Sequence, residues 1–380
     1  MNNNNFIINN ANIFMPDCEF KSGNLYISNG VISNEPAGDS QILESENLYI
    51  IPGLTDIHFH GCNGHDFCDG TFESLEAITQ YEAQNGITSI CPATMTLSEE
   101  DLTRVMKAAR KFHESNSALA GINLEGPFIS PAKPGAQNPK YIIKPDVNML
   151  TRLQDSSGGL IKIAVVAPEV DNGLEFVSQA KNIANISLGH TACNYETASQ
   201  AFSLGANHLT HTYNAMNPIN HRDPGPVIAA LENKNVMIEI ICDGLHVHPS
   251  IVKATLKLFG DDRVIFISDS TEAAGMKDGV YKLGGLDVIK KGNKATLTDG
   301  KTLAGGACNL MECFRTTVKI MNISLETAVK CSSVNPAKCI NSLDSIGVIE
   351  SGRIANLAAL DKELNLKWVI QGGSLIDSTK

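Results

Sequence analysis

The chain contains 380 residues, of which 43% are hydrophobic and 19% are charged, a composition typical of a folded globular protein large enough for more than one core. Its formal net charge of −11 argues against nucleic acid or an anionic membrane as the main partner, and we expect neither. The ten cysteines form no CxxC pair, and the asparagine-rich N-terminal segment lacks the features of a signal peptide, so we expect reduced thiols and a cytoplasmic protein.

Both ends of the chain are rich in short β-prone segments. Residues 6–50 contain "FIINNANIF", "NLYISNGVIS" and "ENLYIIPG", which are separated by Gly, Pro, Asn and Asp without a helical segment between them. After residue 345, "IGVIESGRIANLAAL" and "LKWVIQGGSLI" also have the pattern of strands with glycine turns. We therefore predict a small β-sandwich-like domain made from residues 1–51 and 345–380, with residues 52–344 inserted between them.

The middle of the chain alternates strand-like and helix-like segments, which is typical of βα units. "SEEDLTRVMKAARKFHE" is one predicted helix, because Ser98 can cap it and three acidic residues follow. Eight parallel strands, each followed by a helix, close into a (β/α)8 TIM-type barrel, and we predict this α/β fold for residues 52–344. The eight predicted strands are "LTDIHFH", "ITSICPAT", "GINLEG", "IKIAVVAPE", "ISLGHT", "HLTHTYN", "VMIEIICDG" and "VIFISDS".

Histidines and acids follow most of these strands at their carboxyl ends, where barrel active sites lie. His58 and His60 are two residues apart, so on a strand both side chains point to one face. This pair alone is a weak signal, because a buried histidine beside a solvated one is common. The other predicted strand ends carry Thr94, Glu125, Glu169, His190, His211, Asp243 with His246, and Asp269. Together they predict a cluster of imidazoles and carboxylates around the barrel axis.

Such a cluster is suited to a divalent metal ion. Imidazole nitrogen and carboxylate oxygen bind zinc, which we expect first, and also iron, manganese or cobalt. A metal lowers the pKa of bound water and polarises a carbonyl, while a nearby carboxylate such as Asp269 can shuttle the proton. His58 and His60 are predicted to hold a second ion or to support the first. The predicted ligands of the first ion are Glu125, His190 and His211.

A series of motifs extends from about residue 50 to 360, and the most specific are "LEGPF", "THTYNAM" and "DGLHVHP". With "PGLTDIHFHG", "GITSICPATMT", "GAQNP", "GHT", "RDPGP", "SDSTEAAG", "LAGG" and "GVIESGRIANLAAL", they resemble the amidohydrolase superfamily and, within it, the N-acetylglucosamine-6-phosphate deacetylase family. The resemblance implies removal of acetate from N-acetyl-D-glucosamine 6-phosphate to give D-glucosamine 6-phosphate, in amino-sugar catabolism or cell-wall sugar recycling. It also implies one or two metal ions per subunit, the same three principal ligands, and Asp269 as general base and acid.

The resemblance further implies a set of substrate-binding residues. Arg222 matches a phosphate-binding arginine that can come from the neighbouring subunit, which implies a homodimer. The family often has histidine where this chain has Gln137; glutamine donates a hydrogen bond but cannot carry charge, so oxyanion stabilisation would rest more on the metal. The implied substrate-binding residues are Ala136, Gln137, Asn214, Ala215, Arg222, His246, Leu303, Ala304 and Gly305.

Two kinds of alternative remain open at this point. One is another amidohydrolase, such as an N-acetylgalactosamine-6-phosphate deacetylase, a dihydroorotase or a purine deaminase. The other is a non-catalytic sugar-phosphate sensor on the same fold, although the full set of predicted ligands argues against it. Asp56, Glu169 and His208 are interpreted as structural, and His65, His113, His221 and His248 as loop or surface residues.

Overall fold

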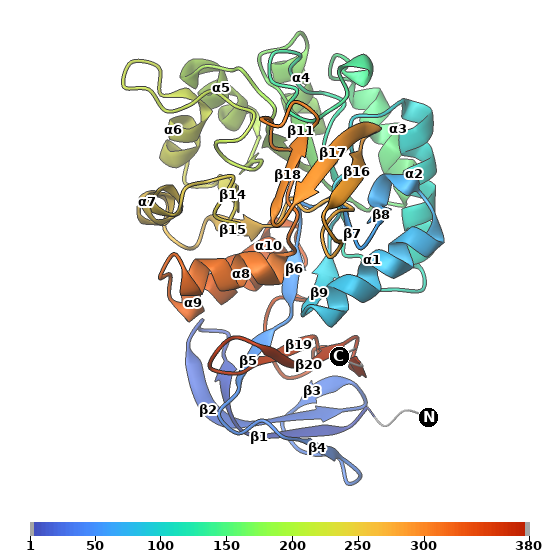
Figure 1. The fold of residues 1–380 in the computed structure, drawn as a ribbon, viewed down its shortest axis with the longest axis vertical. Helices are drawn as coiled ribbons and strands as arrows, with labels where there is room; N and C mark the ends of the chain where they lie inside the picture. Colours follow the sequence, from blue (N-terminus) through green and yellow to red (C-terminus); the bar gives the residue numbers. More distant parts are fainter. Residues whose placement is uncertain (1–3, 377–380) are drawn as a thin grey trace.

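The computed structural model describes residues 4–376 and contains the predicted eight-stranded parallel barrel (Figure 1). Every predicted barrel strand is present, although most are shorter than the sequence segments. Pattern and structure agree because the strands are apolar and buried on both faces, as in parallel sheets covered by helices. The strands are β6 (Leu54–Asp56), β9 (Ile87–Ile90), β10 (Ile122–Leu124), β11 (Ile161–Val166), β12 (Asn185–Leu188), β13 (His208–Leu209), β14 (Met237–Ile241) and β15 (Val264–Ile267).

Hydrogen bonds close the strands into a ring. Strands β10 to β15 form one continuous parallel sheet, and β6 pairs with β9. The parallel bridge between Ala93 and Asn123 joins β9 to β10. On the other side, the amide of Asp269 donates to the carbonyl of His58 at 2.9 Å, which joins β15 to β6. The predicted (β/α)8 architecture is therefore confirmed.

Helices follow each strand and surround the barrel (Figure 1). Helix α2 begins as predicted, because the Ser98 side chain accepts a hydrogen bond from the Asp101 amide at 3.2 Å. The helices are α1 (Phe72–Gln84), α2 (Glu99–His113), α3 (Val147–Ser157), α4 (Gly173–Ala180), α5 (Tyr195–Leu204), α6 (Gly225–Glu232), α7 (Pro249–Phe259), α8 (Leu310–Lys319), α9 (Leu325–Val329) and α10 (Asn335–Cys339). Within residues 4–376 we find no helix with the length and apolar character needed to cross a membrane.

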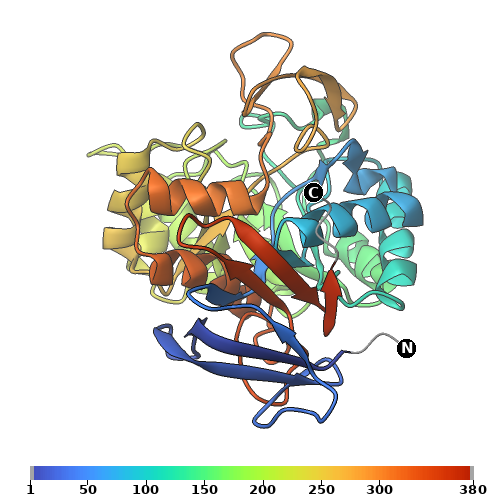
Figure 2. The same cartoon turned by 60° about the horizontal axis from the view of Figure 1, so that its bottom comes forward.

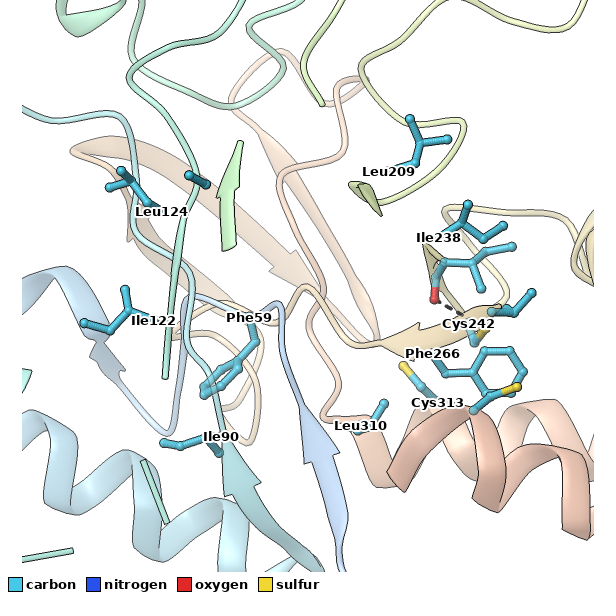
Figure 3. Packing of buried hydrophobic residues seen from close by; sticks show 14 of the residues in the cluster. Phe59, Ile90, Ile122, Leu124, Leu209, Ile238, Cys242, Phe266, Leu310 and Cys313 are labelled. Carbon is cyan, nitrogen blue, oxygen red and sulfur yellow. Dashed lines mark hydrogen bonds between the residues drawn. The ribbon is translucent and has the colours of Figure 1, made fainter. Parts of the chain in front are cut away.

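An extended apolar core fixes the helices against the barrel (Figure 3). Strand residues such as Ile90, Ile122 and Phe266 are buried beside Leu310 of α8, and each is at most 1% exposed. Burying apolar surface contributes about 25 cal/mol per Å², so this core supplies most of the force that holds the strand ends in place. The polar residues that follow the strands are therefore carried on a rigid frame.

A separate sheet is built from both chain ends and lies below the barrel in Figure 1. Its strand order is β21-β20-β19-β5-β1-β2-β3, with β4 also paired to β1, so the layers expected of a sandwich are joined as one hydrogen-bonded sheet. Phe6, Ile27, Leu357 and Ile370 belong to its own apolar core. Its strands are β1 (Phe6–Phe14), β2 (Phe20–Ser28), β3 (Val31–Ser33), β4 (Gln41–Leu43), β5 (Tyr49–Pro52), β19 (Leu357–Leu360), β20 (Leu366–Gln371) and β21 (Ser374–Ile376). The domain boundaries at 51/52 and 344/345 stay a prediction.

One strand prediction near the C-terminus was wrong. Of the segment 345–360, only Leu357–Leu360 is a strand, and the part before it is irregular apart from a single bridge between Val31 and Ile354. Gly347 and Gly352 have φ of +86° and +92°, which breaks an extended chain. Ile349 is nevertheless buried in the core of the small sheet, so its apolar character reflects packing rather than a strand.

A three-stranded antiparallel sheet between β15 and α8 was not predicted from the sequence. It consists of β16 (Gly279–Leu283), β17 (Leu286–Lys291) and β18 (Lys294–Leu297), and it stands out from the barrel in Figure 2. The "GG" and "GN" pairs between its strands are hairpin signals that could have revealed it. Two further short strands, β7 (Gly61–Cys62) and β8 (His65–Asp66), pair beside the end of β6.

Candidate metal and substrate site

Four histidines and two acids meet at the carboxyl ends of the barrel strands. His58 and His60 follow β6, Glu125 follows β10, and Asp269 follows β15. His190 and His211 follow β12 and β13. Each of these six residues is at most 8% exposed. The structure therefore brings together all the residues that were predicted as metal ligands or proton shuttle.

Glu125 lies at the centre of the first group. Its Oε1 atom is 3.1 Å from His190 Nε2 and 2.9 Å from His211 Nε2. The two imidazole Nε2 atoms are 3.1 Å from each other. Ligand atoms bound to one ion at about 2.0–2.2 Å lie about 3.0–3.5 Å apart, so these three atoms are arranged as neighbouring ligands of one ion.

The HxH pair forms a second group beside the first. His58 Nε2 is 3.2 Å from Glu125 Oε1 and 3.7 Å from Asp269 Oδ1. His60 Nε2 is 3.3 Å from both Glu125 Oε2 and Asp269 Oδ1. Glu125 Oε1 thus lies near His58 as well as the first group, and Oε2 lies near His60. Two sets of donor atoms are close enough to hold an ion, His58 with Glu125 and His211, and His58 with His60 and Asp269.

The electrostatics of the cluster favour a bound cation. Burial alone would lower the pKa of His60, but Asp269 and Glu125 raise it to about 10. Burial opposes protonation of His58 as well, and Glu239 and Glu125 raise its pKa well above the usual range. His58 Nε2 is buried and has no hydrogen-bond partner among residues 4–376. Buried carboxylates need a positive charge, and a divalent ion would supply it while also giving this nitrogen a partner.

Several residues of the cluster have an unusual backbone. His190, His211 and Asp269 have φ of +47°, +24° and +51°, and Ala215 beside them has +47°. Side chains other than glycine rarely adopt positive φ, at a cost of about 1–3 kcal/mol each, and such residues gather at functional sites. The Gly306 amide donates to the Asp269 carbonyl at 2.6 Å and holds one of these turns. Three of these four residues, His190, His211 and Asp269, belong to the cluster of predicted ligands and proton shuttle.

A cavity of about 280 Å³ opens above the cluster. Most of the predicted substrate residues line it, namely Ala136, Gln137, Asn214, Ala215, His246, Leu303 and Gly305. Ala304 is fully buried beside them, as part of a small apolar cluster with Leu283. Arg222, by contrast, lies on an exposed loop and is not among the described residues that line this cavity. His246 Nδ1 is held by Asp243 Oδ2 at 2.7 Å.

Gln137 is anchored from both sides. Its Oε1 atom accepts from the Thr96 amide at 2.7 Å, and its Nε2 atom donates to Glu125 Oε2 at 2.6 Å. The side chain therefore orients the central carboxylate, a contact that the sequence analysis did not foresee. Because an amide nitrogen carries two hydrogens, one remains for the predicted contact with a substrate carbonyl.

Sequence reasoning missed two contributors to the site. Glu239 on β14 lies 2.8 Å from His58 Nδ1 and accepts from the His211 amide at 3.0 Å. A lone acid within the apolar segment "VMIEII" was the available signal. Leu283 of β16 lines the cavity, and it was overlooked together with its sheet.

The acids interpreted as structural are bonded to nearby groups of the barrel. Asp56 accepts from Ser268 Oγ at 2.5 Å, and Glu169 accepts from the Ala192 amide at 2.6 Å. His208 is fully buried, and its Nε2 lies 3.7 Å from Glu239 Oε1. These contacts support the strand ends rather than the cavity.

Comparison with known proteins gives the class of the chain. The model for the Amidohydrolase family matches residues 49–376, so the chain belongs to the amidohydrolase family. The chain is 34% identical to the N-acetylglucosamine-6-phosphate deacetylase of Bacillus subtilis (strain 168), over 93% of each chain. It is 29% identical to the N-acetylgalactosamine-6-phosphate deacetylase of Escherichia coli O157:H7, over 92% of this chain and 93% of the relative. The predicted membership is confirmed, and the chain groups with the amino-sugar phosphate deacetylases of this family of hydrolases.

Solved structures agree with this grouping. A mutant of the N-acetyl-D-glucosamine-6-phosphate deacetylase of Mycobacterium smegmatis, in complex with N-acetyl-D-glucosamine-6-phosphate, superposes with a TM-score of 0.92 at 29% identity, covering 98% of this chain and 99% of that one. The Pasteurella multocida deacetylase also gives a TM-score of 0.92, at 28% identity over 98% and 99% of the two chains. More distant amidohydrolases, such as an enamidase at 15% identity and a TM-score of 0.63, share the fold alone.

Proposed function

We propose that this protein hydrolyses the acetamide of N-acetyl-D-glucosamine 6-phosphate, releasing acetate and D-glucosamine 6-phosphate, in amino-sugar catabolism or cell-wall sugar recycling. The observation that carries the proposal is the meeting of Glu125, His190, His211 and Asp269 below a cavity large enough for a sugar. The deacetylase relatives in bacteria and animals support the same reaction. None of them favours a dihydroorotase, a purine deaminase or a non-catalytic sensor.

The chemistry divides between the ion and the residues around it. A divalent ion at this site supplies Lewis acidity, which polarises the acetamide carbonyl and lowers the pKa of a bound water. Asp269 takes the proton from the attacking water as the C–O bond forms, and then delivers it to the nitrogen as the C–N bond breaks. Burial alone would raise the pKa of Asp269, but His60 and His58 hold it below its usual range and keep the carboxylate ready to accept.

The substrate is positioned by the walls of the cavity. We assign Asn214, Ala215 and His246 to the sugar phosphate, because they line the cavity on the side of β13 and β14. Asp243 holds His246 Nδ1 at 2.7 Å, which leaves Nε2 free for the substrate. We assign residues 303–305 to closure over the acetyl group, and Ala136 and Gln137 line the same cavity.

Arg222 is proposed to bind the phosphate of substrate in a neighbouring subunit. It is exposed and lies outside the cavity lining of its own chain, as far as residues 4–376 are concerned. A chain with a net charge of −11 needs a local cation to bind a phosphate, and arginine does this with paired hydrogen bonds. Ile219 lies three residues before Arg222, and Leu245 precedes the cavity-lining His246. Together with Ile251 of α7 they are exposed apolar residues, which suit a homodimer interface.

Metal identity and location complete the proposal. Zinc is the first choice for a site of imidazoles and carboxylates, with iron, manganese or cobalt as alternatives and one or two ions per subunit. The free cysteines, eight of which are buried, suit a reducing compartment, and we propose the cytoplasm.

The test is an assay of acetate release on four substrates: N-acetylglucosamine, N-acetylgalactosamine and the 6-phosphate of each. Metal content is measured on the same sample, before and after chelation. We expect turnover of N-acetylglucosamine 6-phosphate, a large loss without phosphate, and complete loss after chelation that added metal restores. Faster turnover of the galactosamine phosphate would favour the function of the E. coli relative. Equal rates with and without phosphate would contradict the proposal.

A further inference from the structure

Glu239 is a fully buried acid beneath the candidate metal site. It lies on β14, within an otherwise apolar strand, and is 0% exposed. Its Oε2 atom is 2.8 Å from His58 Nδ1 and accepts from the His211 amide at 3.0 Å. One oxygen thus contacts residues that follow two different strands, β6 and β13, and both residues belong to the predicted ligand set.

The contact with His58 fixes how that imidazole faces the site. A carboxylate only accepts hydrogen bonds, so His58 Nδ1 carries a hydrogen, and a metal ion would be bound through the lone pair of Nε2. That Nε2 atom lies 3.2 Å from Glu125 Oε1 and 3.7 Å from Asp269 Oδ1. A carboxylate that holds the far nitrogen of a metal-binding histidine sets its tautomer and orientation in many metal sites.

The contact with His211 acts on the backbone instead. His211 has φ of +24°, a conformation that costs free energy for any side chain with a Cβ atom. The hydrogen bond from its amide to Glu239 helps to hold this conformation, which places His211 Nε2 2.9 Å from Glu125 Oε1. Loss of the acceptor would release the backbone on which this ligand is mounted.

We propose that Glu239 is a positioning residue that couples the two metal-binding groups, His58 with His60 and His190 with His211, through a single carboxylate oxygen. Its other oxygen, Oε1, has no hydrogen-bond partner among residues 4–376 and lies 3.7 Å from His208 Nε2. A buried carboxylate with one unpaired oxygen is costly, so packing alone does not account for an acid at this position of an apolar strand. The inference rests on the proposed metal site and is independent of which sugar phosphate is the substrate.

The test measures metal affinity rather than turnover. Glu239→Gln keeps the size of the side chain and one accepting oxygen but removes the charge, whereas Glu239→Ala removes the acceptor as well. Glu82→Gln is the matched control, because Glu82 is also a buried acid, at 1% exposure, and lies on helix α1. Each protein is stripped and titrated with Zn²⁺ against a chromogenic chelator, and bound zinc is counted by elemental analysis.

We expect Glu239→Gln to weaken zinc binding by about 10- to 100-fold, Glu239→Ala to weaken it further or to lose one ion, and the control to match the wild type. The loss should shrink when Glu239→Gln is made in a His58→Ala background, because Glu239 then has one ligand fewer to position. Wild-type zinc affinity in a folded Glu239→Gln protein, shown by an unchanged circular dichroism spectrum, would overturn the proposal. That variant decides the matter even if the alanine variant does not fold. Since no substrate is used, failure of the deacetylase assay would leave this result intact.

Discussion

The candidate site is enclosed by two walls, the floor and the cover, which are built differently. The floor consists of residues at the barrel strand ends, among them Glu125, His211 and Asp269, and all are at most 8% exposed. The cover consists of the three-stranded sheet β16–β18 and the following residues 302–305, which present Leu283 and Leu303 to the cavity. The floor is charged, strained and fixed by the barrel core, whereas the cover presents mostly apolar residues to the cavity and rests on a small apolar cluster.

This contrast separates chemistry from recognition. Charges that must meet at distances near 3 Å are mounted on a rigid frame, because small displacements there cost reactivity. The cover needs only to exclude water and to fit the acetyl group, and apolar contacts do so with looser geometry. Changes in the floor should therefore lower kcat, and changes in the cover should mainly raise KM.

The largest effect is expected from Asp269→Asn in the floor. Asparagine has the same shape but cannot accept a proton, so kcat should fall by about 10²- to 10⁴-fold. Metal content and the melting temperature should stay near the wild-type values, which elemental analysis and calorimetry would check. Full activity in this variant would show that Asp269 is not the proton shuttle, and it would contradict the proposal that residues of the floor determine kcat.

Arg222→Ala tests a residue that belongs to neither wall of its own chain. Loss of charge-assisted hydrogen bonds worth about 1.5–3 kcal/mol should raise KM for the phosphorylated substrate by roughly 10- to 100-fold, with little change in kcat. At substrate concentrations well below KM, a mixture of Arg222→Ala and Asp269→Asn subunits, refolded together, should regain activity, because one of the two sites in a mixed dimer has both residues intact. No recovery on mixing, with mixed dimers present by native mass spectrometry, would place Arg222 outside the neighbouring site.

Leu283→Ala tests the cover itself. Leu283 is 2% exposed and packs in the small cluster of the cover, so truncation removes apolar contact with the substrate and loosens the sheet. We expect KM to rise about fivefold, equivalent to about 1 kcal/mol, while kcat changes less than twofold. Steady-state kinetics with saturating metal would measure both. A drop in kcat as large as that of Asp269→Asn would contradict the proposal that the floor determines kcat and the cover mainly determines KM.

The two walls also differ in how far the sequence predicted them. The floor was predictable because barrel geometry converts a residue's place after a strand into a place in space, so His190 and His211 could be brought together from distant segments. Glu239 was missed because its partners, His58 and the His211 amide, lie far from it in the sequence. They reach it only through the pairing of the barrel strands and the unusual backbone of His211, which leave no local sequence pattern. The cover was missed because the sheet is an insertion outside the βα repeat, although its glycine turns were visible. The part of "IGVIESGRIANLAAL" before Leu357 is not a strand as predicted, because apolar residues on an irregular segment, such as Ile349, are buried just as well.

The smallest effect on turnover is expected from Glu82→Gln, which lies outside both walls. Burial raises the pKa of Glu82 to about 8 from its usual 4.5. Below about pH 4.5 the acid is protonated in both the folded and unfolded chain, so it carries no charge penalty. Between that pH and about 8 the unfolded chain releases the proton while the folded chain keeps it, so wild-type stability falls with rising pH by a few kcal/mol and then levels off.

Glutamine has no such proton to lose, so the stability of the variant relative to the wild type should increase as the pH rises through this range. Urea unfolding at pH 5 and pH 8 would measure the difference, with kcat and KM expected to stay at wild-type values. Parallel stability profiles for the two proteins would show that Glu82 is ionised in the fold with a partner of its own. A loss of kcat would instead show that Glu82 acts on the floor from helix α1, through Asp56 or through Cys62, which both flank the His58–His60 pair in sequence.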